Sequence, residues 1–326
     1  MSLKAIAAVL GLSVTTVSRA LNGYQDVAQE TRKRIEEEAQ RRGYRPNAAA
    51  RRLKTGRANA VGFVYPIGAS PLNGSDFSDM LLALEHHLAR YDINLLLLAD
   101  KQQSQATLTR LLRSGAVDAL IVGHTTPEDS RLHALLQTNF RFLALGRSDL
   151  PSTYAWFDVD HLAGSQLAVG WSLAQGRQRI AWLGSNENST RVRDRRQGYL
   201  TALGEVTPYA MAAVAPSRRA GYQQTREWLA EGPVPEVIIT DCAALAEGAA
   251  LALQLAGRAA GEGAILLAGW EGLPRDAILD HPIVAIRQAT PHQAGEQVAE
   301  MVIRLIDGAP PETLQTLWQP WLQLPA

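Results

Sequence analysis

From Ala60 onward, apolar runs of strand length alternate with amphipathic stretches of helical spacing. Strands that alternate with helices along a chain are typical of parallel, doubly wound sheets. About 260 residues of this pattern exceed one typical sheet, so the sequence predicts two α/β sub-domains. The predicted strands cover residues 60–65, 93–98, 117–122, 141–145, 179–183, 236–240, 264–268 and 283–286. The predicted helices between them cover residues 76–90, 105–114, 129–138, 160–176, 192–204, 219–231, 243–257 and 291–307.

The first 57 residues differ from the rest in charge. They contain 12 Lys and Arg against 5 Asp and Glu, whereas the remaining residues contain 20 against 27. A basic head on an acidic body is expected when only the head approaches a polyanion. A disordered basic tail is the alternative, but regular apolar periodicity within the segment disfavours it.

Three short helices are predicted in this basic head. The first covers residues 3–10 and ends at Gly11, the second is capped by Ser13 and runs to about Leu21, and the third covers about 29–42. Two helices joined by a turn at a glycine and followed by a third form a helix-turn-helix arrangement. The sequence therefore predicts a small all-α helix-turn-helix head before the α/β body.

The second helix of the head carries side chains suited to reading DNA. Val17 faces inward, whereas Thr15 and Arg19 lie one turn apart on the opposite face and Val14 lies at the exposed start. A helix fits the major groove, where arginine bonds guanine in bidentate fashion and an apolar group meets a thymine methyl. A solvated helix face with a lone arginine is the alternative, which the basic head and the segment after it disfavour.

The head resembles the lactose-repressor (LacI/GalR) family of bacterial transcription regulators. The resemblance rests on VTTVSRALN at residues 14–22, on Thr31-Arg32 and Ile35, and on GYRPNAAARRL at residues 43–53. It extends more loosely through the whole chain. It implies that Val14, Thr15 and Arg19 contact bases. Residues implied to hold phosphates or to orient the head are Ser13, Thr16, Ser18, Asn22, Thr31, Tyr44 and Asn47.

The resemblance also implies a hinge helix and a dimer. The small residues from Ala48, with Ala50 among them, match a hinge helix in which Leu53 wedges into the minor groove. Such a short helix is marginal alone and is expected to form only on DNA, against the copy from a second subunit. A plain linker is the alternative. The family binds near-palindromic operators as a homodimer, and the absence of a C-terminal leucine heptad predicts a dimer and not a tetramer.

These features predict a division of the chain into three parts. Residues 1–46 are expected to form the helix-turn-helix domain and residues 47–58 the hinge helix and linker. Residues 59–326 are expected to bind the effector and to dimerise. Within them, the predicted sub-domains are 59–158 plus 290–316, and 159–289 plus 317–326, of the periplasmic-binding-protein-like type that the resemblance implies.

No catalytic, cofactor or metal motif is found in the sequence. It lacks GxGxxG after a strand, GxxxxGK[ST], HExxH and GxSxG. The single cysteine, Cys242, excludes an intramolecular disulfide. The apolar runs are far shorter than a membrane span, and the N-terminus lacks the pattern of a secretory signal. We therefore expect a cytoplasmic protein that is not an enzyme, needs no cofactor and contacts no membrane.

The resemblance places an effector between the two sub-domains, at the carboxyl ends of the strands. Asp76 and Phe77 open the helix after the first strand and supply a carboxylate and an aromatic face for a sugar, although Phe77 could equally belong to the core. Arg147 and Arg195 match ligand-facing family positions. Three further arginines lie at 191, 193 and 196, either as surface charges or as a phosphate site.

Later strands contribute the remaining effector candidates. Asp241 follows the strand at 236–240, where the family usually has Asn-Asp and this chain has Thr-Asp. Trp270 and Glu271 replace the family's usual aromatic–Asp pair, and burial of Trp270 in the core is the alternative to stacking on a ligand. Gln288 ends the strand at 283–287. Carboxylates with arginine and aromatic residues indicate a neutral sugar, and a nucleobase remains an alternative.

The sequence thus predicts a regulator that binds double-stranded operator DNA. We expect a repressor of a carbohydrate-utilisation operon that a sugar inducer releases. A corepressor-type or activating regulator responding to a sugar phosphate or nucleobase is the alternative. A sugar-binding protein of a transporter and a sugar-modifying enzyme fit the basic head and the motif search less well.

Overall fold

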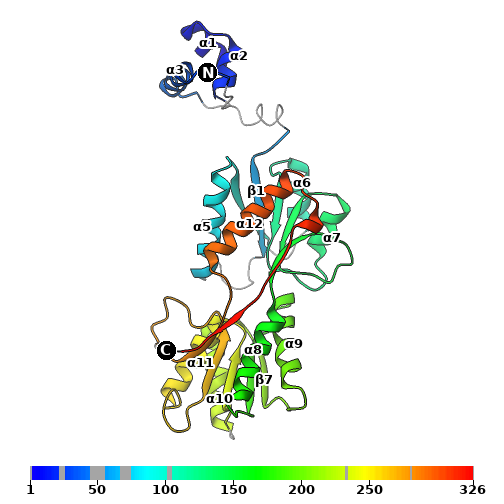
Figure 1. Cartoon of the computed structure of the whole chain (residues 1–326), viewed down its shortest axis with the longest axis vertical. Coiled ribbons are helices and arrows are strands. Elements are labelled where there is room, and N and C mark those ends of the chain that lie inside the picture. The colour runs from blue at the N-terminus through cyan, green and yellow to red at the C-terminus, as the bar shows by residue number, and fades with distance from the viewer. Residues whose placement is uncertain are drawn as a thin grey trace. The chain divides into compact units, whose positions relative to one another are not determined.

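The computed structural model describes residues 2–21, 26–44, 56–66, 75–100, 105–231, 234–279 and 281–325. The chain forms two compact units, Met1–Ala58 and Asn59–Ala326, which we call the head and the body. Each is described here by itself (Figure 1).

The head consists of α1 (Leu3–Leu10), α2 (Val14–Leu21) and α3 (Gln29–Arg41), as the sequence predicts. Gly11 ends α1 with a φ of 66°, a left-handed conformation that glycine adopts without strain. The axes of α1 and α2 differ by 110°, within the range of a helix-turn-helix pair. In the described part of the chain no single helix is long and apolar enough to cross a membrane; only α1 and α2 taken together, despite this bend, reach that length and composition.

The body contains two six-stranded sheets with the same core topology. The first has the order β11-β5-β4-β3-β1-β2 and the second the order β12-β10-β9-β8-β6-β7. All pairs are parallel except β10 with β12, which is antiparallel. Within each sheet the first five strands in chain order lie as 2-1-3-4-5, which is a doubly wound arrangement. The predicted fold class is confirmed.

The elements of the first sub-domain are β1 (Ala60–Pro66), α5 (Ser75–Ala89), β2 (Asn94–Asp100), α6 (Gln105–Ser114), β3 (Ala119–Val122), α7 (Ser130–Gln137), β4 (Phe142–Leu145), β5 (Ala155–Val159), α12 (Pro291–Ile306), η1 (Pro311–Thr313) and β11 (Gln315–Trp318). Those of the second are α8 (His161–Ala174), β6 (Ile180–Ser185), α9 (Thr190–Leu203), β7 (Ala210–Val214), α10 (Arg218–Glu231), β8 (Val237–Thr240), α11 (Ala243–Leu255), β9 (Leu266–Trp270), β10 (Ile283–Arg287) and β12 (Trp321–Gln323).

The chain passes between the two sheets three times, as the traces in Figure 1 show. The passages join β5 to α8, β10 to α12, and β11 to β12. In the first sheet, β5 extends to Val159, and β11, which the chain forms when it comes back to this sheet, extends to Trp318. These points lie one and two residues beyond the bounds expected from the sequence.

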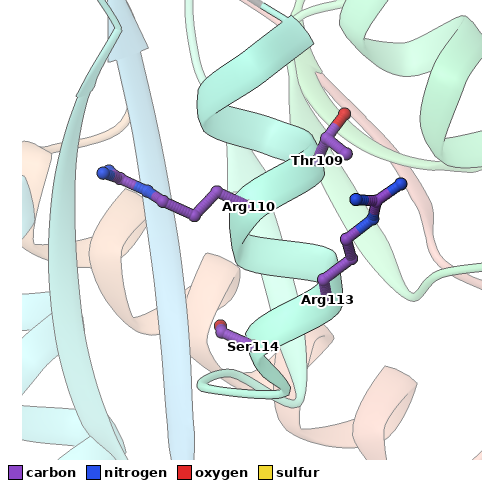
Figure 2. Close-up of a pocket in the computed structure, with 4 residues that line it drawn as sticks. All are labelled: Thr109, Arg110, Arg113 and Ser114. Carbon is purple, nitrogen blue, oxygen red and sulfur yellow. The ribbon is translucent and has the colours of Figure 1, made fainter.

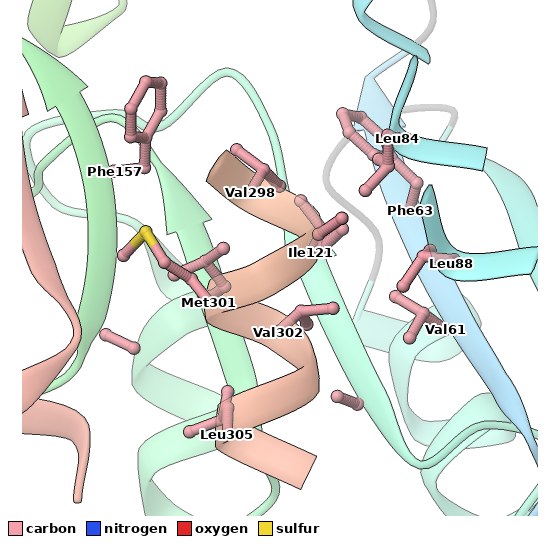
Figure 3. Packing of buried hydrophobic residues seen from close by; sticks show 14 of the residues in the cluster. Val61, Phe63, Leu84, Leu88, Ile121, Phe157, Val298, Met301, Val302 and Leu305 are labelled. Atoms are coloured by element: carbon pink, nitrogen blue, oxygen red, sulfur yellow. The ribbon is translucent and has the colours of Figure 1, made fainter. Parts of the chain in front are cut away.

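The core of the first sub-domain forms where α12 and α5 pack on the sheet. Val298, Met301, Val302 and Leu305 lie along α12, between Phe157 on one side and the side chains of α5 on the other (Figure 3). All of them are buried, and burial of such side chains stabilises a fold by about 1.5–3 kcal/mol each. This packing stabilises the first sheet, and the carboxyl ends of its strands form one side of the candidate site.

Four strands were not predicted from the sequence. β5 contains Asp158, which interrupts its apolar run, and β7 is built largely of alanine. β11 and β12 are short strands at the outer edges of their sheets, where little apolar surface is buried. A weak apolar pattern is the common reason that they were missed.

Candidate functional site

Helix α2 presents a polar face and buries an apolar one. Ser13 caps the helix, because its Oγ accepts a hydrogen bond from the Thr16 backbone N–H at 2.9 Å. Val17 is fully buried in the head, whereas Val14 and Thr15 are exposed at the start of the helix. Two of the three side chains that the sequence selects for base contact, Val14 and Thr15, are therefore accessible.

The other predicted DNA contacts differ in their surroundings. Arg19 forms an ion pair with Asp26 at 2.5 Å, with both side chains about half exposed. Thr31 lies in α3, half-buried, and Tyr44 packs against the apolar core of the head. Ser18 is half-buried on α2. The predicted contacts that lie outside the described residues are Asn22, Asn47, Ala50 and Leu53.

In the body, the topology selects one place for a ligand. In a doubly wound sheet the crevice opens at the carboxyl ends of the strands, where the connections leave in opposite directions. Here those points lie between β1 and β3 in the first sheet and between β6 and β8 in the second. The Thr190 backbone N–H donates to the Thr125 carbonyl at 3.1 Å, so α9 of one sheet begins beside the segment that follows β3 of the other.

Arg195 lies at the centre of this region and is only 2% exposed. Its guanidinium lies over the Trp270 ring, 4.1 Å from the centroid. Its Nε donates to His161 Nδ1 at 3.3 Å, and its Nη1 donates to the Asp241 carbonyl. Its Nη2 lies 4.0 Å from Glu271 Oε1. Residues predicted from α9, β9 and the end of β8 are therefore brought together around one arginine.

Asp241 retains an unused acceptor. Oδ2 accepts a hydrogen bond from the Ser185 backbone N–H at 2.7 Å, whereas Oδ1 is buried and has no hydrogen-bond partner. The side chain is 1% exposed, and burial raises the pKa of its carboxyl. A buried acceptor without a partner is costly, which makes this atom a natural contact for a ligand hydroxyl.

Glu271 and Arg287 form the far side of the site. Glu271 directly follows β9 and has a φ of 70°, a strained conformation for a residue other than glycine. Its carbonyl accepts a hydrogen bond from Arg287 Nη1 at 2.5 Å. Gln288, the residue predicted from the sequence, is half-buried directly after β10. The strand thus places Arg287 next to Glu271, a neighbour that sequence reasoning missed.

Cations and carboxylates lie close together within the site. Arg191 Nη2 pairs with Glu187 Oε2 at 3.2 Å, and Arg191 Nε is buried without a hydrogen-bond partner. Burial, together with the charge of Arg191, lowers the pKa of Arg195 to about 10, so Arg195 remains a cation at neutral pH. The two cations therefore face the carboxylates of Asp241, Glu187 and Glu271.

The first sub-domain contributes aromatic side chains. The Phe77 ring lies 4.8 Å from Tyr65 and 5.8 Å from Phe63, so Phe77 packs on the core of the sheet. His124 stands edge-on to Tyr65 at 5.2 Å, and burial lowers its pKa to about 3, with a further contribution from Arg191. Phe77, Tyr65 and His124 form the aromatic edge at the carboxyl ends of β1 and β3.

Two predicted residues of the effector site bind protein groups. Asp76 lies 3.6 Å from Arg275, which also contacts Asp79 at 3.1 Å and so joins the segment after β9 to α5. Arg147 donates to Asp158 at 2.8 Å and lies 3.9 Å from Asp194. Asp76 thus takes part in a contact between the two sub-domains, and Arg147 binds a residue of β5, the strand that precedes the first passage.

The stacking face predicted at Trp270 is not open, so this prediction is corrected. The ring is 0% exposed, Arg195 lies over it, and its Nε1 donates to Ser165 Oγ at 3.1 Å. An added Cβ at Gly164 would lie 2.4 Å from the ring, which shows how closely α8 confines it. Trp270 can contact an effector only indirectly, through Arg195.

A separate surface hollow of about 590 Å³ lies along α6, lined by Thr109, Arg110, Arg113 and Ser114. The two arginine side chains point to different sides of the helix (Figure 2). Two diverging cations on one helix do not form a site for an anion. Among the described residues, no group of three or more His, Cys, Asp or Glu side chains is placed to hold a metal ion.

Comparison with known families agrees with both parts of this geometry. Residues 2–47 match the bacterial regulatory proteins of the lacI family. Residues 58–318 match the periplasmic binding proteins and sugar binding domain of the LacI family. The chain belongs to the LacI family.

Individual relatives match this chain over most or nearly all of its length. The HTH-type transcriptional regulator RafR of Escherichia coli is 46% identical over 323 residues, which cover 98% of this chain and 96% of RafR. The crystal structure of a transcriptional regulator from Yersinia pestis biovar Microtus has 40% identity and a TM-score of 0.78, and covers 82% of this chain and 98% of its own. The operator-bound lac repressor dimer has 23% identity and a TM-score of 0.84 over 99% and 97% of the two chains, a likeness of fold. This LacI-family chain is a DNA-binding transcription regulator with a sugar binding domain.

Sequence reasoning missed several residues of the site in this regulator. His161 and Arg287 carry no motif, and they are recognised only because folding places them against Arg195 and Glu271. Arg275 likewise carries no motif, and its contact with Asp79 of α5 depends on the fold. Arg191 was noticed within an arginine cluster, but its members separate: Arg193 binds Asp149 and Asp194, and Arg196 is exposed.

Proposed function

We propose that this LacI-family protein is a homodimeric repressor that a neutral sugar releases from its operator. The observation that carries the proposal is the convergence of Arg195, Asp241 and Glu271 at the ligand-binding edges of the sheets. Sugar hydroxyls need acceptors and donors together, which a carboxylate and a guanidinium supply. The family's sugar binding domain covers these residues.

The charge pattern favours a neutral sugar over a phosphorylated one. A phosphate is bound by arginines that converge on it. In this site Arg191 already faces Glu187, and Arg193 is occupied by Asp149. The unpartnered Asp241 Oδ1 would repel a phosphate and attract a hydroxyl. A sugar phosphate or a nucleobase remains the second candidate class for the same site.

On the DNA side, we propose that Val14, Thr15 and Arg19 read bases in the major groove. Their exposure on α2 supports this role, and the ion pair of Arg19 with Asp26 is weak enough to be exchanged for DNA. Ser13, Thr16, Ser18, Thr31 and Tyr44, with Asn22 and Asn47, would hold phosphates and orient the head. Ala50 and Leu53 would belong to a hinge that enters the minor groove.

We propose a binding role without catalysis, exerted at the bacterial nucleoid in the cytoplasm. Sugar binding would draw the strand ends of the two sheets together and change the relation of the two subunits at the hinge. Coupling free energies of this kind are about 1–3 kcal/mol, or up to roughly 150-fold in operator affinity. In this account the moving units are the two sub-domains, which divide within one or two residues of the boundaries expected at 159 and 317.

A thermal-shift screen tests the ligand class. The full chain is heated with glucose, galactose, lactose, cellobiose, fructose 1-phosphate or adenine, each in large excess. A ligand at 100 times its Kd stabilises the native state by about 2.7 kcal/mol, which raises the melting midpoint measurably. A shift with a neutral sugar is expected, and a shift only with fructose 1-phosphate or adenine would contradict the proposal.

A pair of neighbouring variants tests the site. Arg195→Ala should lose the sugar-induced shift because the buried contact with Asp241 and Glu271 disappears. Arg196→Ala is the matched control, because Arg196 is exposed on the same helix and should keep the shift. Both should bind operators selected from a random duplex library. If Arg195→Ala kept the sugar-induced shift, the ligand would bind elsewhere. If the sugar strengthened operator binding, it would act as a corepressor and not as an inducer.

A further inference from the structure

His161 connects the ligand arginine to the first sub-domain. It is the first residue of α8, directly after the passage from β5, and it is 7% exposed. Its Nδ1 accepts a hydrogen bond from Arg195 Nε at 3.3 Å, and its Nε2 lies 3.4 Å from Asp158 Oδ1. The ring also stands edge-on to Trp270, with centroids 5.0 Å apart. The imidazole is therefore held from β5, α9 and β9 at once.

The hydrogen-bonding partners determine the protonation of this imidazole. An arginine Nε can only donate, so His161 Nδ1 must carry a lone pair and the ring proton must reside on Nε2, facing Asp158. Burial lowers the pKa of His161, and the charges of Arg195 and Arg191 lower it further, while Asp158 acts in the opposite direction. The ring is therefore neutral at neutral pH, in the form that can accept from Arg195.

The chain of contacts continues beyond His161. Burial by itself raises the pKa of Asp158, but the hydrogen bonds from His161 and Arg147 outweigh it, so the pKa is lowered and the carboxylate stays ionised. Arg147 donates to Asp158 Oδ2 at 2.8 Å and lies 3.9 Å from Asp194. The contacts Arg147–Asp158–His161–Arg195 thus run from the end of the first sheet, along the passage, into the second.

We propose that His161 is a positioning residue for the effector. Its neutral imidazole, anchored on Asp158, fixes the plane of the Arg195 guanidinium against Trp270, so that the remaining N–H groups of Arg195 are aimed toward Asp241, Glu271 and the ligand. This inference rests on the proposed function, because it takes Arg195 as an effector contact. It adds a residue whose role is carried out through another side chain.

Two substitutions of His161 separate positioning from simple packing. In His161→Asn, the amide oxygen can replace Nδ1 as the acceptor for Arg195, and the side chain does not titrate. In His161→Leu, the acceptor is lost and the buried Arg195 Nε–H has no partner. His133→Asn is the matched control, because His133 is exposed on α7 and its ring is hydrogen-bonded to the Gln137 side chain of the same helix.

Isothermal titration of the full chain with glucose, galactose, lactose and cellobiose supplies the first measurement. For any of these that binds, His161→Leu should weaken affinity by about tenfold, the usual consequence of one buried donor left unsatisfied. His161→Asn and His133→Asn should bind the sugar with nearly the same affinity as the original protein. Affinity of the original protein should fall as the pH drops through the lowered pKa of His161, whereas His161→Asn should lack that decline.

A second measurement needs no ligand. Nitrogen-15 NMR of the free protein should show His161 as the tautomer protonated at Nε2, with a slowly exchanging Arg195 Nε–H that His161→Asn keeps and His161→Leu loses. The opposite tautomer, or equal affinities and pH profiles for the original protein and both His161 variants, would overturn the inference. Failure of the proposed function looks different: Arg195→Ala would then bind sugar normally.

Discussion

The fit of Trp270 against α8 can be tested by a pair of identical substitutions in one helix. Gly164 and Gly170 both lie in α8, in helical conformation. A Cβ added at Gly164 would lie 2.4 Å and 2.5 Å from two atoms of the Trp270 ring and 3.0 Å from Ile286. A Cβ added at Gly170 would meet nothing within 4 Å. The same chemical change therefore probes a filled space and an open one.

The expected magnitudes follow from this difference. Replacing glycine by alanine within a helix stabilises it by about 0.5–1 kcal/mol, and Gly170→Ala should show this gain alone. At Gly164 the ring cannot move aside freely, because it is fully buried, bonded to Ser165 and covered by Arg195. Overpacking of this kind costs about 1–3 kcal/mol, so Gly164→Ala should be destabilised by about 1–2 kcal/mol on balance.

Thermal unfolding followed by tryptophan fluorescence measures both variants. All seven tryptophans lie in the body, so the signal reports the body alone. With about 2–4 °C per kcal/mol for a unit of this size, Gly164→Ala should melt about 2–8 °C lower and Gly170→Ala about 1–4 °C higher. Gly164→Ala should also bind sugar more weakly, because displacement of Trp270 moves Arg195. Equal midpoints for the two variants would refute the close packing on which this reasoning depends.

Two further predictions concern the charge and the assembly of the body. Burial raises the pKa of the Asp241 carboxyl, so its contribution to stability is fully present below the pKa of the unfolded chain and is lost as the pH rises through the folded pKa. Asp241→Asn should therefore raise the melting midpoint at pH 7.5 and lose that advantage as the pH is lowered through the raised pKa of Asp241; a pH-independent difference would contradict this. Leu82 of α5, Leu97 of β2 and Leu255 of α11 are 67%, 59% and 69% exposed, which fits a surface covered in a dimer. Light scattering after size exclusion should give a dimer, Leu97→Glu should shift it toward monomer, and a tetramer would be inconsistent with the proposal.

The match between sequence and fold is best where apolar side chains recur with a regular period. The runs that became β1, β3, β6 and β8 are buried on both faces, and a buried strand needs the continuous apolar pattern that the sequence displays. Strand β7 is a counterexample, since its alternating half-exposed alanines leave little signal. Strand β5 holds Asp158 because that carboxylate serves the contact with His161 and not the core.

In the candidate site, too, some residues could be predicted from the sequence and others could not. Arg195, Asp241 and Glu271 could be named beforehand, because a resemblance of motif and the rule for strand ends both point to them. His161 is 34 residues from Arg195 in the chain, and no local pattern links the two. The direction of the Trp270 ring was likewise open from sequence, since stacking and burial require the same residue type.

Periodicity and charge in the sequence alone determined a basic helical head on a doubly wound body, because these properties follow from which residues are apolar and how they are spaced. Motif resemblance added the family and singled out Arg195 as a candidate effector contact. The tertiary structure alone decided what that arginine touches. Its hydrogen bonds to His161 and Asp241 join elements that are distant in the chain. The absence of a side chain at Gly164 leaves the space that is filled by the Trp270 ring, over which Arg195 lies. Such contacts depend on how helices and sheets pack, which no stretch of sequence contains by itself.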